Sequence, residues 1–280
     1  MKTFLITLPI IGDYNNLQTL RIRMLGDFLA FRDPALFSIT QLRLAWLGEL
    51  SGKAPVKMDS LNSVTLVLRF QITGDVLFAQ APNLHQLHSL TLWGRLSLET
   101  LKPQQQLPDS SQFPPNLTKL ILWNSKLEQD PMPVLEKLPN LRFLQLNAFA
   151  YVGKSMSCSS AGGFPRLQHL ILFFLHNLRE WRVEAGAMPS LTHLTINRCR
   201  MLKMLPEGLQ HMTTLIHLTI NYCDKLEMLP ERLQQVTTLR RLKLSLMPRE
   251  LNNRVRNTVR HIPSIIFEHE LQEEMLSIYG

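Results

Sequence analysis

Ten times between Leu17 and Leu244 the chain repeats one short phrase: an apolar residue, two variable residues, an apolar residue, one variable residue and a further apolar residue. The copies begin at Leu17, Ile39, Leu61, Leu87, Leu117, Leu141, Leu167, Leu191, Leu215 and Leu239. Neighbouring copies start 22 to 30 residues apart, and an eleventh, weaker copy begins at Ile262. A period of this length indicates stacked units, none of which can bury its apolar face alone.

The clearest pair of units is 191–214 and 215–238, LTHLTINRCRMLKMLPEGLQHMTT and LIHLTINYCDKLEMLPERLQQVTT, which agree at 16 of 24 places. Phrase and period are typical of a leucine-rich repeat solenoid. Each unit supplies one short strand, and neighbouring strands pair in parallel about 4.8 Å apart. We therefore predict an α/β fold, a curved horseshoe of about ten to eleven repeats with parallel strands along its concave face.

We expect one leucine-rich repeat domain over residues 1–280. Residues 1–16 are predicted to form a degenerate or truncated first repeat, 17–262 the repeats, and 263–280 the last strand and a C-terminal cap. Within that cap, the acidic segment 268–280 is predicted to form an amphipathic helix. The insertions in the longest intervals, 99–115 and 150–165, are rich in Pro, Gly, Ser or Gln and are predicted to be loops.

The chain has three cysteines, an odd number that argues against a disulfide framework. Cys199 and Cys223 lie one period apart, so we predict reduced core residues whose thiols contact loop backbone. Cys158, in the segment SMSCSSAGG, is predicted to be exposed. No stretch reaches the roughly 18 apolar residues of a membrane span. The short apolar run after Lys2 lacks a signal-peptide cleavage site, and we expect a cytoplasmic protein.

Several phrases resemble the leucine-rich repeat region of plant intracellular disease-resistance proteins of the coiled-coil and nucleotide-binding class. They are FPPNLTKLILWNSKLEQDPMPVLEKLPNLRFLQL, GGFPRLQHLIL, MPSLTHLTINRCRMLKMLPEGLQHMTTL and the closing MPRELNNRVRN. The resemblance implies a role in defence: sensing a pathogen effector or an effector-modified host protein, and holding a nucleotide-binding switch domain inactive. Its implied partners are such proteins and the coiled-coil and nucleotide-binding domains of the same family.

We expect those upstream domains to be absent from the chain, so nucleotide binding is not transferred to it. Gly153-Lys154-Ser155 spells the end of a phosphate-binding loop, but Ala148 stands where that motif needs its first glycine. No cofactor is predicted.

Side chains at places 3, 5 and 7 of each repeat are expected to point out of the concave face, flanked by place 2. Over ten repeats these 40 places contain no Asp or Glu. They contain the basic residues Arg21, Arg23, Arg43, Lys119, Arg142, Arg240, Arg241 and Lys243. A basic zone at each end predicts an acidic protein partner. The alternative is that these charges only keep the chain soluble.

Large apolar residues on the same face separate the two basic zones. They are Trp93, Ile121, Trp123, Phe143 and Phe173. Outward-facing aromatic side chains are typical of binding hot spots, so we predict a contact surface. The alternatives are that an irregular repeat turns them inward or that the segment 102–116 covers them.

His169, His193 and His217 share place 3 of three consecutive repeats, so their rings should form a column about 5 Å apart. A flat column offers no convergent metal ligands. A pH-sensitive contact and simple surface histidines are the two readings left open.

Catalysis is not predicted, because the face has no carboxylate for acid–base chemistry and no nucleophile paired with a base. No nucleic-acid-binding module matches either, and no nucleic-acid partner is expected. Two functions remain: the sensor solenoid of an immune switch, and a stand-alone cytosolic adaptor such as a substrate-recognition module for protein degradation.

Overall fold

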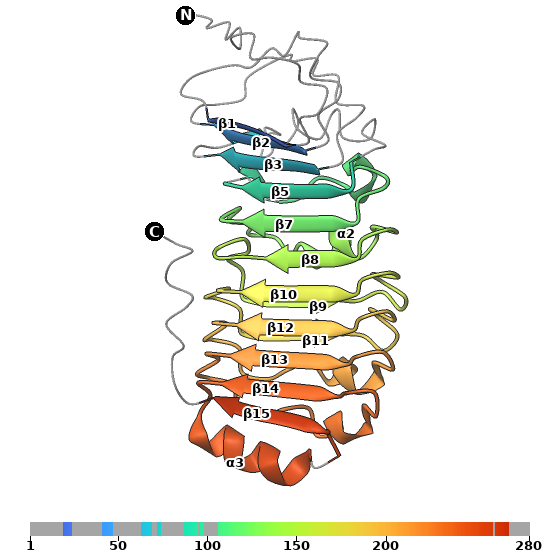
Figure 1. The fold of residues 1–280 in the computed structure, drawn as a ribbon, viewed down its shortest axis with the longest axis vertical. Coiled ribbons are helices and arrows are strands. Elements are labelled where there is room, and N and C mark those ends of the chain that lie inside the picture. The colour runs from blue at the N-terminus through green and yellow to red at the C-terminus, as the bar shows by residue number, and fades with distance from the viewer. Residues whose placement is uncertain are drawn as a thin grey trace, which may run out of the picture.

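A computed structural model describes residues 19–23, 41–46, 63–68, 72–73, 87–94, 96–97, 106–259 and 261–268. Within this described part, one sheet of eleven parallel strands runs the length of the molecule in chain order (Figure 1). The strands are β1 Thr19–Arg23, β2 Gln41–Trp46, β3 Ser63–Leu68, β5 Ser89–Trp93, β7 Lys119–Trp123, β8 Phe143–Leu146, β10 His169–Phe173, β12 His193–Asn197, β13 His217–Asn221, β14 Arg241–Ser245 and β15 Ser264–Glu268. The predicted leucine-rich repeat solenoid is confirmed.

The shorter elements connect and cover these strands. They are β4 Ile72–Thr73, β6 Leu96–Ser97, β9 Ser155–Cys158, β11 Glu180–Val183, the 3-10 turns η4 Ser110–Gln112, η5 Glu207–His211 and η6 Leu233–Gln235, and the helices α2 Met132–Leu135 and α3 Arg249–Thr258. Segments β9, β11 and α2 lie behind the main sheet, so the opposite face of the sheet carries no layer from the described chain (Figure 1). We call that uncovered side the open face.

Identical places of successive repeats pair with each other, Leu170 with Leu194, Leu194 with Leu218, and Leu218 with Leu242. None of these four leucines is more than 1% exposed. The phrase places apolar residues two apart within a strand, so both turn to the same side of the sheet. Burying one leucine contributes about 1.5–3 kcal/mol, and each repeat gains it only from its neighbours.

A left-handed residue follows most strands in the second half of the molecule. The φ angle is 59° at Phe174, 55° at Arg198 and 50° at Tyr222. The Phe174 amide donates to the carbonyl of Asn197 at 2.8 Å, and the Arg198 amide to that of Asn221 at 2.8 Å. Such a conformation costs about 1–3 kcal/mol in a residue with a side chain. It continues the ladder of hydrogen bonds past the strand end and sets these side chains in a column along one edge.

Cys199 and Cys223 are free, fully buried thiols, as predicted. The Cys199 Sγ donates to the carbonyl of Leu172 at 3.8 Å, and the Cys223 Sγ to that of Asn221 at 3.4 Å. Burial raises the pKa of the Cys199 thiol to about 12 and that of Cys223 still further. Both thiols therefore stay protonated at neutral pH and serve as small core groups.

The prediction that Cys158 is exposed in a loop is wrong, because it ends strand β9 and is 1% exposed. Strand β9 pairs in parallel with β11 of the next repeat, placing Cys158 beside Val183. The Asp130 carboxylate anchors the segment by accepting the Ser157 amide at 2.7 Å. The same strand rules out a phosphate-binding loop at Gly153-Lys154-Ser155, since a strand and no helix follows these residues.

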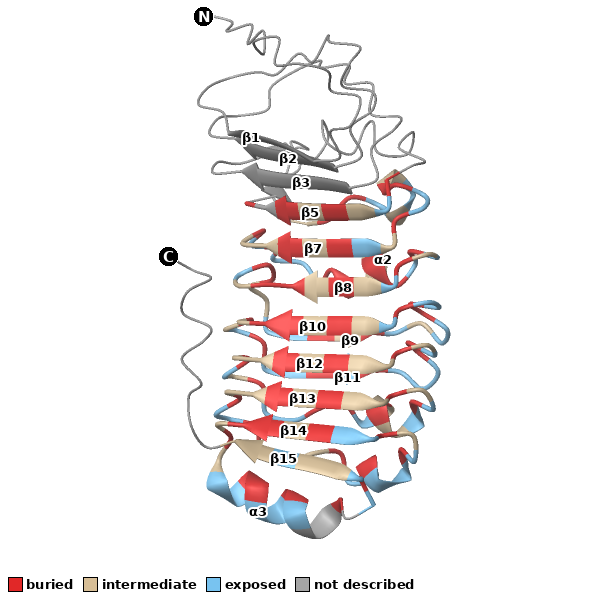
Figure 2. Ribbon diagram, viewed as in Figure 1, coloured by how far each residue is buried: buried red, intermediate tan, exposed pale blue. Residues whose placement is uncertain are grey.

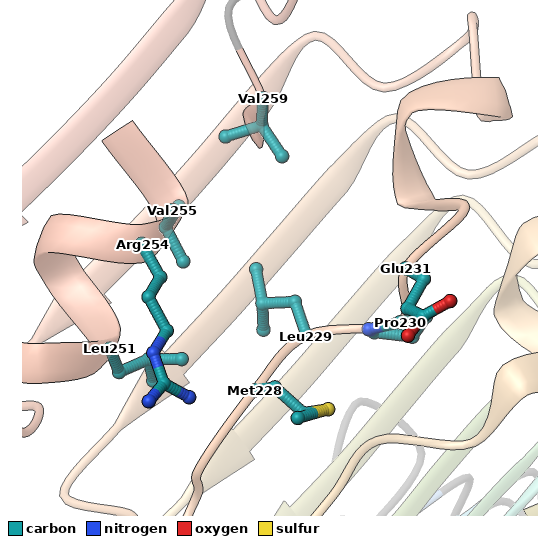
Figure 3. Close-up of a pocket in the computed structure, with 8 residues that line it drawn as sticks. All are labelled: Met228, Leu229, Pro230, Glu231, Leu251, Arg254, Val255 and Val259. Carbon is teal, nitrogen blue, oxygen red and sulfur yellow. The ribbon is translucent and has the colours of Figure 1, made fainter. Parts of the chain in front are cut away.

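Helix α3 closes the C-terminal end of the described stack. Leu251, Val255 and Val259 are at most 3% exposed and face the last repeats. Between them and the segment 228–231 lies a largely apolar hollow of about 450 Å3, with Met228 among the residues that line it (Figure 3). The eleventh repeat is confirmed as β15, and Glu268 belongs to this strand and does not begin a helix. Residues 269–280 of the predicted helix, and the predicted degenerate repeat over 1–16, lie outside the described residues.

Candidate protein-interaction face

Along strands β7, β8, β12 and β13, buried core residues alternate with side chains that are partly exposed on the open face (Figure 2). In β12 the burial sequence from His193 to Asn197 is intermediate, buried, intermediate, buried, intermediate. The partly exposed places are the ones the sequence predicts. Of the predicted contact residues, Lys119, Arg142, Arg240 and Arg241 are exposed, and Ile121, Trp123, Phe143, His169, His193, His217 and Lys243 are half-buried.

The N-terminal basic zone is described only by its backbone. Strands β1 and β2 place Arg21 directly beside Arg43, and Arg23 beside Ala45. Parallel neighbours lie about 4.8 Å apart, so the three arginines share one patch of the sheet. Strand register also places Trp93 beside Trp123. The side chains of Arg21, Arg23, Arg43 and Trp93 lie outside the described residues.

A continuous row of polar and aromatic side chains runs across the middle of the open face. We call it the central row, made up of Lys119, Phe143, His169, His193, His217 and Arg241, which are consecutive register partners. The His169 and His193 ring centroids are 4.4 Å apart, and those of His193 and His217 are 4.5 Å apart. The predicted histidine column is thus present as a stack of rings.

The stack continues past the histidines at its N-terminal end. The Phe143 ring lies 5.9 Å from that of His169, and the Lys119 Nζ lies 5.0 Å from the Phe143 centroid. A cation at this distance is attracted to the negative face of an aromatic ring. The central row therefore carries a fixed positive charge at each end, Lys119 and Arg241, with titratable rings between them.

His193, the middle histidine of the central row, has a lowered pKa. Burial lowers the pKa of His193, and the neighbouring rings of His169 and His217 lower it further. The Thr192 hydroxyl lies 2.8 Å from the His193 Nδ1. A positive charge on His193 is therefore disfavoured, because the ring is partly buried and lies between two other imidazole rings.

The C-terminal basic zone is smaller than the sequence predicts. The Lys243 Nζ forms an ion pair with Glu268 at 2.7 Å, and Glu268 also accepts the Ser245 hydroxyl at 2.9 Å. The hydrogen bond from Lys243 is the main cause of the lowered pKa of Glu268. Extending the register to the eleventh repeat would have placed Glu268 on the face. The exposed charges of this zone are those of Arg240 and Arg241.

The expectation that Phe173 is an outward contact residue is wrong, since its side chain is only 9% exposed. Phe173 ends β10, and the ring of the left-handed Phe174 lies 5.8 Å from it. Asn147 and Ser245, which occupy the same place in other repeats, are also buried. Burial of place 7 thus varies between repeats, since Trp123, Asn197 and Asn221 at the same place are half-buried.

Sequence reasoning missed a second column along the edge where the strands end. The Arg198 guanidinium lies 5.9 Å from the Phe174 ring and 5.0 Å from the Tyr222 ring. Phe174 also meets Phe149 at 6.0 Å, and Phe149 is 42% exposed. The sequence does hold a signal for this column, because Phe174, Arg198 and Tyr222 all occupy place 8 of their repeats. Their left-handed backbone then aligns the three side chains along the edge. This edge borders the open face and adds aromatic surface to it.

The described residues contain no group of three or more His, Cys, Asp or Glu side chains that could hold a metal ion. None of the helices in the described part is long and apolar enough to cross a membrane.

The fold, with its ladder of parallel strands and its uncovered strand face, is that of a leucine-rich repeat protein. The relatives that it matches include plant disease resistance proteins of Arabidopsis thaliana. The chain is 37% identical over 145 residues to the probable disease resistance protein RF9, a match covering 45% of this chain and 14% of that protein. It is 44% identical over 98 residues to the probable disease resistance protein RF45, which covers 35% of this chain and 9% of that protein.

A third relative, the probable disease resistance RPP8-like protein 2, is 44% identical over 79 residues, 28% of this chain and 9% of the relative. The matches thus span a small part of each relative's own length. Among solved structures, a leucine-rich repeat protein of Leptospira interrogans aligns over 90% of this chain and 96% of its own, with 15% identity and a TM-score of 0.30. No protein-family model matches the chain. The predicted resemblance to plant disease resistance proteins is confirmed.

Proposed function

We propose that this chain is a non-catalytic protein-interaction domain of the plant defence response, whose open face binds an acidic protein surface. Its partners are a pathogen effector or an effector-modified host protein, and the nucleotide-binding and coiled-coil domains of the same family, with the switch domain held inactive. It acts in the cytoplasm. The names of its relatives support the role in defence.

The central row is the observation that carries the binding role. It joins Lys119 to Arg241 through stacked aromatic and imidazole rings. Among the described places 2, 3, 5 and 7 of β5 to β15, one carries an acid, Glu268, and that carboxylate is paired with Lys243. A surface of this sign attracts acidic partners and speeds their encounter, while flat rings supply desolvated contact area.

The described histidines and cysteines are not arranged for catalysis. Acid–base chemistry needs a carboxylate or histidine aimed at a hollow that holds substrate, and the histidines here lie stacked against one another. Nucleophilic chemistry would need an accessible thiolate, but burial raises the pKa of Cys158 and of Cys199 to about 12. We therefore infer binding without chemistry.

The experiment is co-purification with a separately expressed nucleotide-binding domain of the family. Reversing two charges of the N-terminal zone, Arg23→Glu with Arg43→Glu, should weaken the association by roughly tenfold or more, because like charges would then face an acidic surface. The matched control is Arg179→Glu with Arg182→Glu, two exposed arginines directly before and within β11, the strand that lies behind the main sheet (Figure 1). Equal retention of both double variants would count against the N-terminal zone as the contact.

A further inference from the structure

A cationic groove lies at the C-terminal end of the molecule, beside the strand ends and away from the central row. Its volume is about 770 Å3, within the range of about 300–1,000 Å3 usual for small-molecule sites. Three arginines and one aspartate line it: Arg200, Arg249, Arg256 and Asp224. The side chains that line the groove therefore carry a net charge of +2, which complements the charge of a dianion.

Helix α3 supplies one wall through a single polar face. Arg249, Asn252, Asn253 and Arg256 line the groove, and their spacing of three, four and seven residues puts them on one side of a helix. The opposite side of α3 is the apolar face that packs on the last repeats. The N-cap residue Pro248 provides no side-chain hydrogen bond, so the first turn of α3 has no side-chain cap. A helix start of this kind favours an anion.

Two buried oxygens at the groove lack partners. Asn252 is only 3% exposed, and its Oδ1 makes no hydrogen bond. The Tyr222 hydroxyl is likewise buried without a partner. A buried polar atom without a partner is destabilising, because it has lost its hydrogen bonds to water. A hydroxyl group on a ligand can donate to Asn252, whereas a phosphate dianion cannot.

Two of the three lining arginines contact neighbouring side chains. The Arg256 guanidinium lies over the Phe267 ring, 4.6 Å from its centroid. The Arg200 Nε lies 3.5 Å from Asp224 in an exposed ion pair. Arg198 adds a further positive charge nearby, since its guanidinium lies 5.0 Å from the centroid of the Tyr222 ring, and Tyr222 lines the groove. Planar guanidinium groups fixed in this way match phosphate oxygens in bidentate fashion.

We propose that this groove binds a small soluble molecule that carries a phosphate monoester together with hydroxyl groups. The phosphate accepts hydrogen bonds from Arg249, Arg256 and the start of α3, and Arg200 exchanges Asp224 for a phosphate oxygen. A ligand hydroxyl donates to Asn252. This site does not depend on the open face or on the proposed defence partners.

Isothermal titration calorimetry on the whole 280-residue chain tests the proposal, with β-glycerophosphate as the phosphate monoester, pyrophosphate as a hydroxyl-free polyanion and glycerol as the uncharged control. Both phosphates should bind saturably and glycerol should not. Arg249→Gln and Arg256→Gln should each weaken binding by roughly tenfold, the loss of one charge-assisted hydrogen bond. Asp224→Asn should tighten it several-fold, because Arg200 is then released from its ion pair.

The matched control is Arg240→Gln, which removes the same charge from the open face. An equal loss in Arg240→Gln and Arg249→Gln would overturn the site, since it would indicate diffuse attraction to a basic chain. Absence of saturable binding, or unchanged affinity in Asp224→Asn, would overturn it as well. Asn252→Ala should weaken β-glycerophosphate and leave pyrophosphate unchanged, with melting temperature as the check on folding. Binding to phosphatidic acid vesicles without binding of the soluble probes would refute a soluble ligand.

Discussion

Gly208 is the residue whose replacement tests most directly how the repeats stack behind the sheet. It lies in η5, and a Cβ added there would stand 2.0 Å from the carbonyl oxygen of Val183 and 2.8 Å from its carbonyl carbon. Carbon and oxygen normally approach to about 3.3 Å, so β11 or η5 must move by more than about 1 Å. The obstacle is backbone of the previous repeat, which cannot rotate away as a side chain could.

The expected cost of Gly208→Ala follows from that displacement. Forcing an extra carbon into a packed site costs about 1–3 kcal/mol, and a backbone obstacle puts this site near the upper value. Alanine also has less conformational freedom than glycine in the unfolded chain, which stabilises the folded state by about 0.4–1 kcal/mol. The net loss is about 2 kcal/mol, which lowers the melting temperature by about 4–8 °C in a domain of this size.

The next repeat supplies the control, because Arg232 occupies the place that Gly208 holds one period earlier. Arg232 is exposed, so Arg232→Ala should change stability by no more than about 0.5 kcal/mol. Circular dichroism melting measures both variants, and hydrogen exchange should show faster opening of 180–183 and 207–211 in Gly208→Ala alone. A Gly208→Ala protein that melts with the wild type would refute the close contact between η5 and β11.

Two further outcomes are expected on the open face. Trp123→Ala should weaken partner binding by roughly tenfold or more while leaving the melting temperature nearly unchanged, because its ring is half-buried at a surface and aromatic hot spots carry such losses; a large fall in melting temperature would place the ring in the core. His193 has a lowered pKa in the folded chain, so the unfolded chain binds more protons below the ordinary histidine pKa of about 6.5 and stability falls as the pH drops through that value. Urea unfolding at about pH 7.5 and about pH 5.5 should show a smaller fall for His193→Gln than for the wild type, and parallel curves would contradict the effect of the stacked rings.

The main sheet was predictable from the sequence because one rule generates it. Apolar residues two apart within each phrase fix the buried side of a strand, and the constant phrase fixes the register between strands. The column of His169, His193 and His217 follows from that register alone, and the structure gives ring separations of 4.4 and 4.5 Å. Burial of Cys199 and Cys223 follows in the same way from their shared place.

The features outside the phrase were not predictable, because their partners are set by packing between unlike segments. Cys158 is buried because the inserted segment β9 in one repeat pairs with β11 in the next, and the repeat pattern of the sequence does not indicate that pairing. Phe173 is covered by a residue whose left-handed backbone the sequence does not signal, as Phe174 is neither Gly nor Asn. The ion pair of Lys243 depends on Glu268, which belongs to the weakest copy of the phrase.

The two candidate sites are close in the chain but separate in the molecule. Arg241 begins strand β14 and belongs to the open face, whereas the groove begins at Leu246, just past the end of that strand. A strand rises about 3.3 Å per residue, so these ends are separated by roughly 16 Å. In a stack where each repeat contacts only its neighbours, effects of substitution stay local. The free-energy changes caused by substitutions on the open face and in the groove should therefore be additive. A negative result at one site does not decide the test of the other.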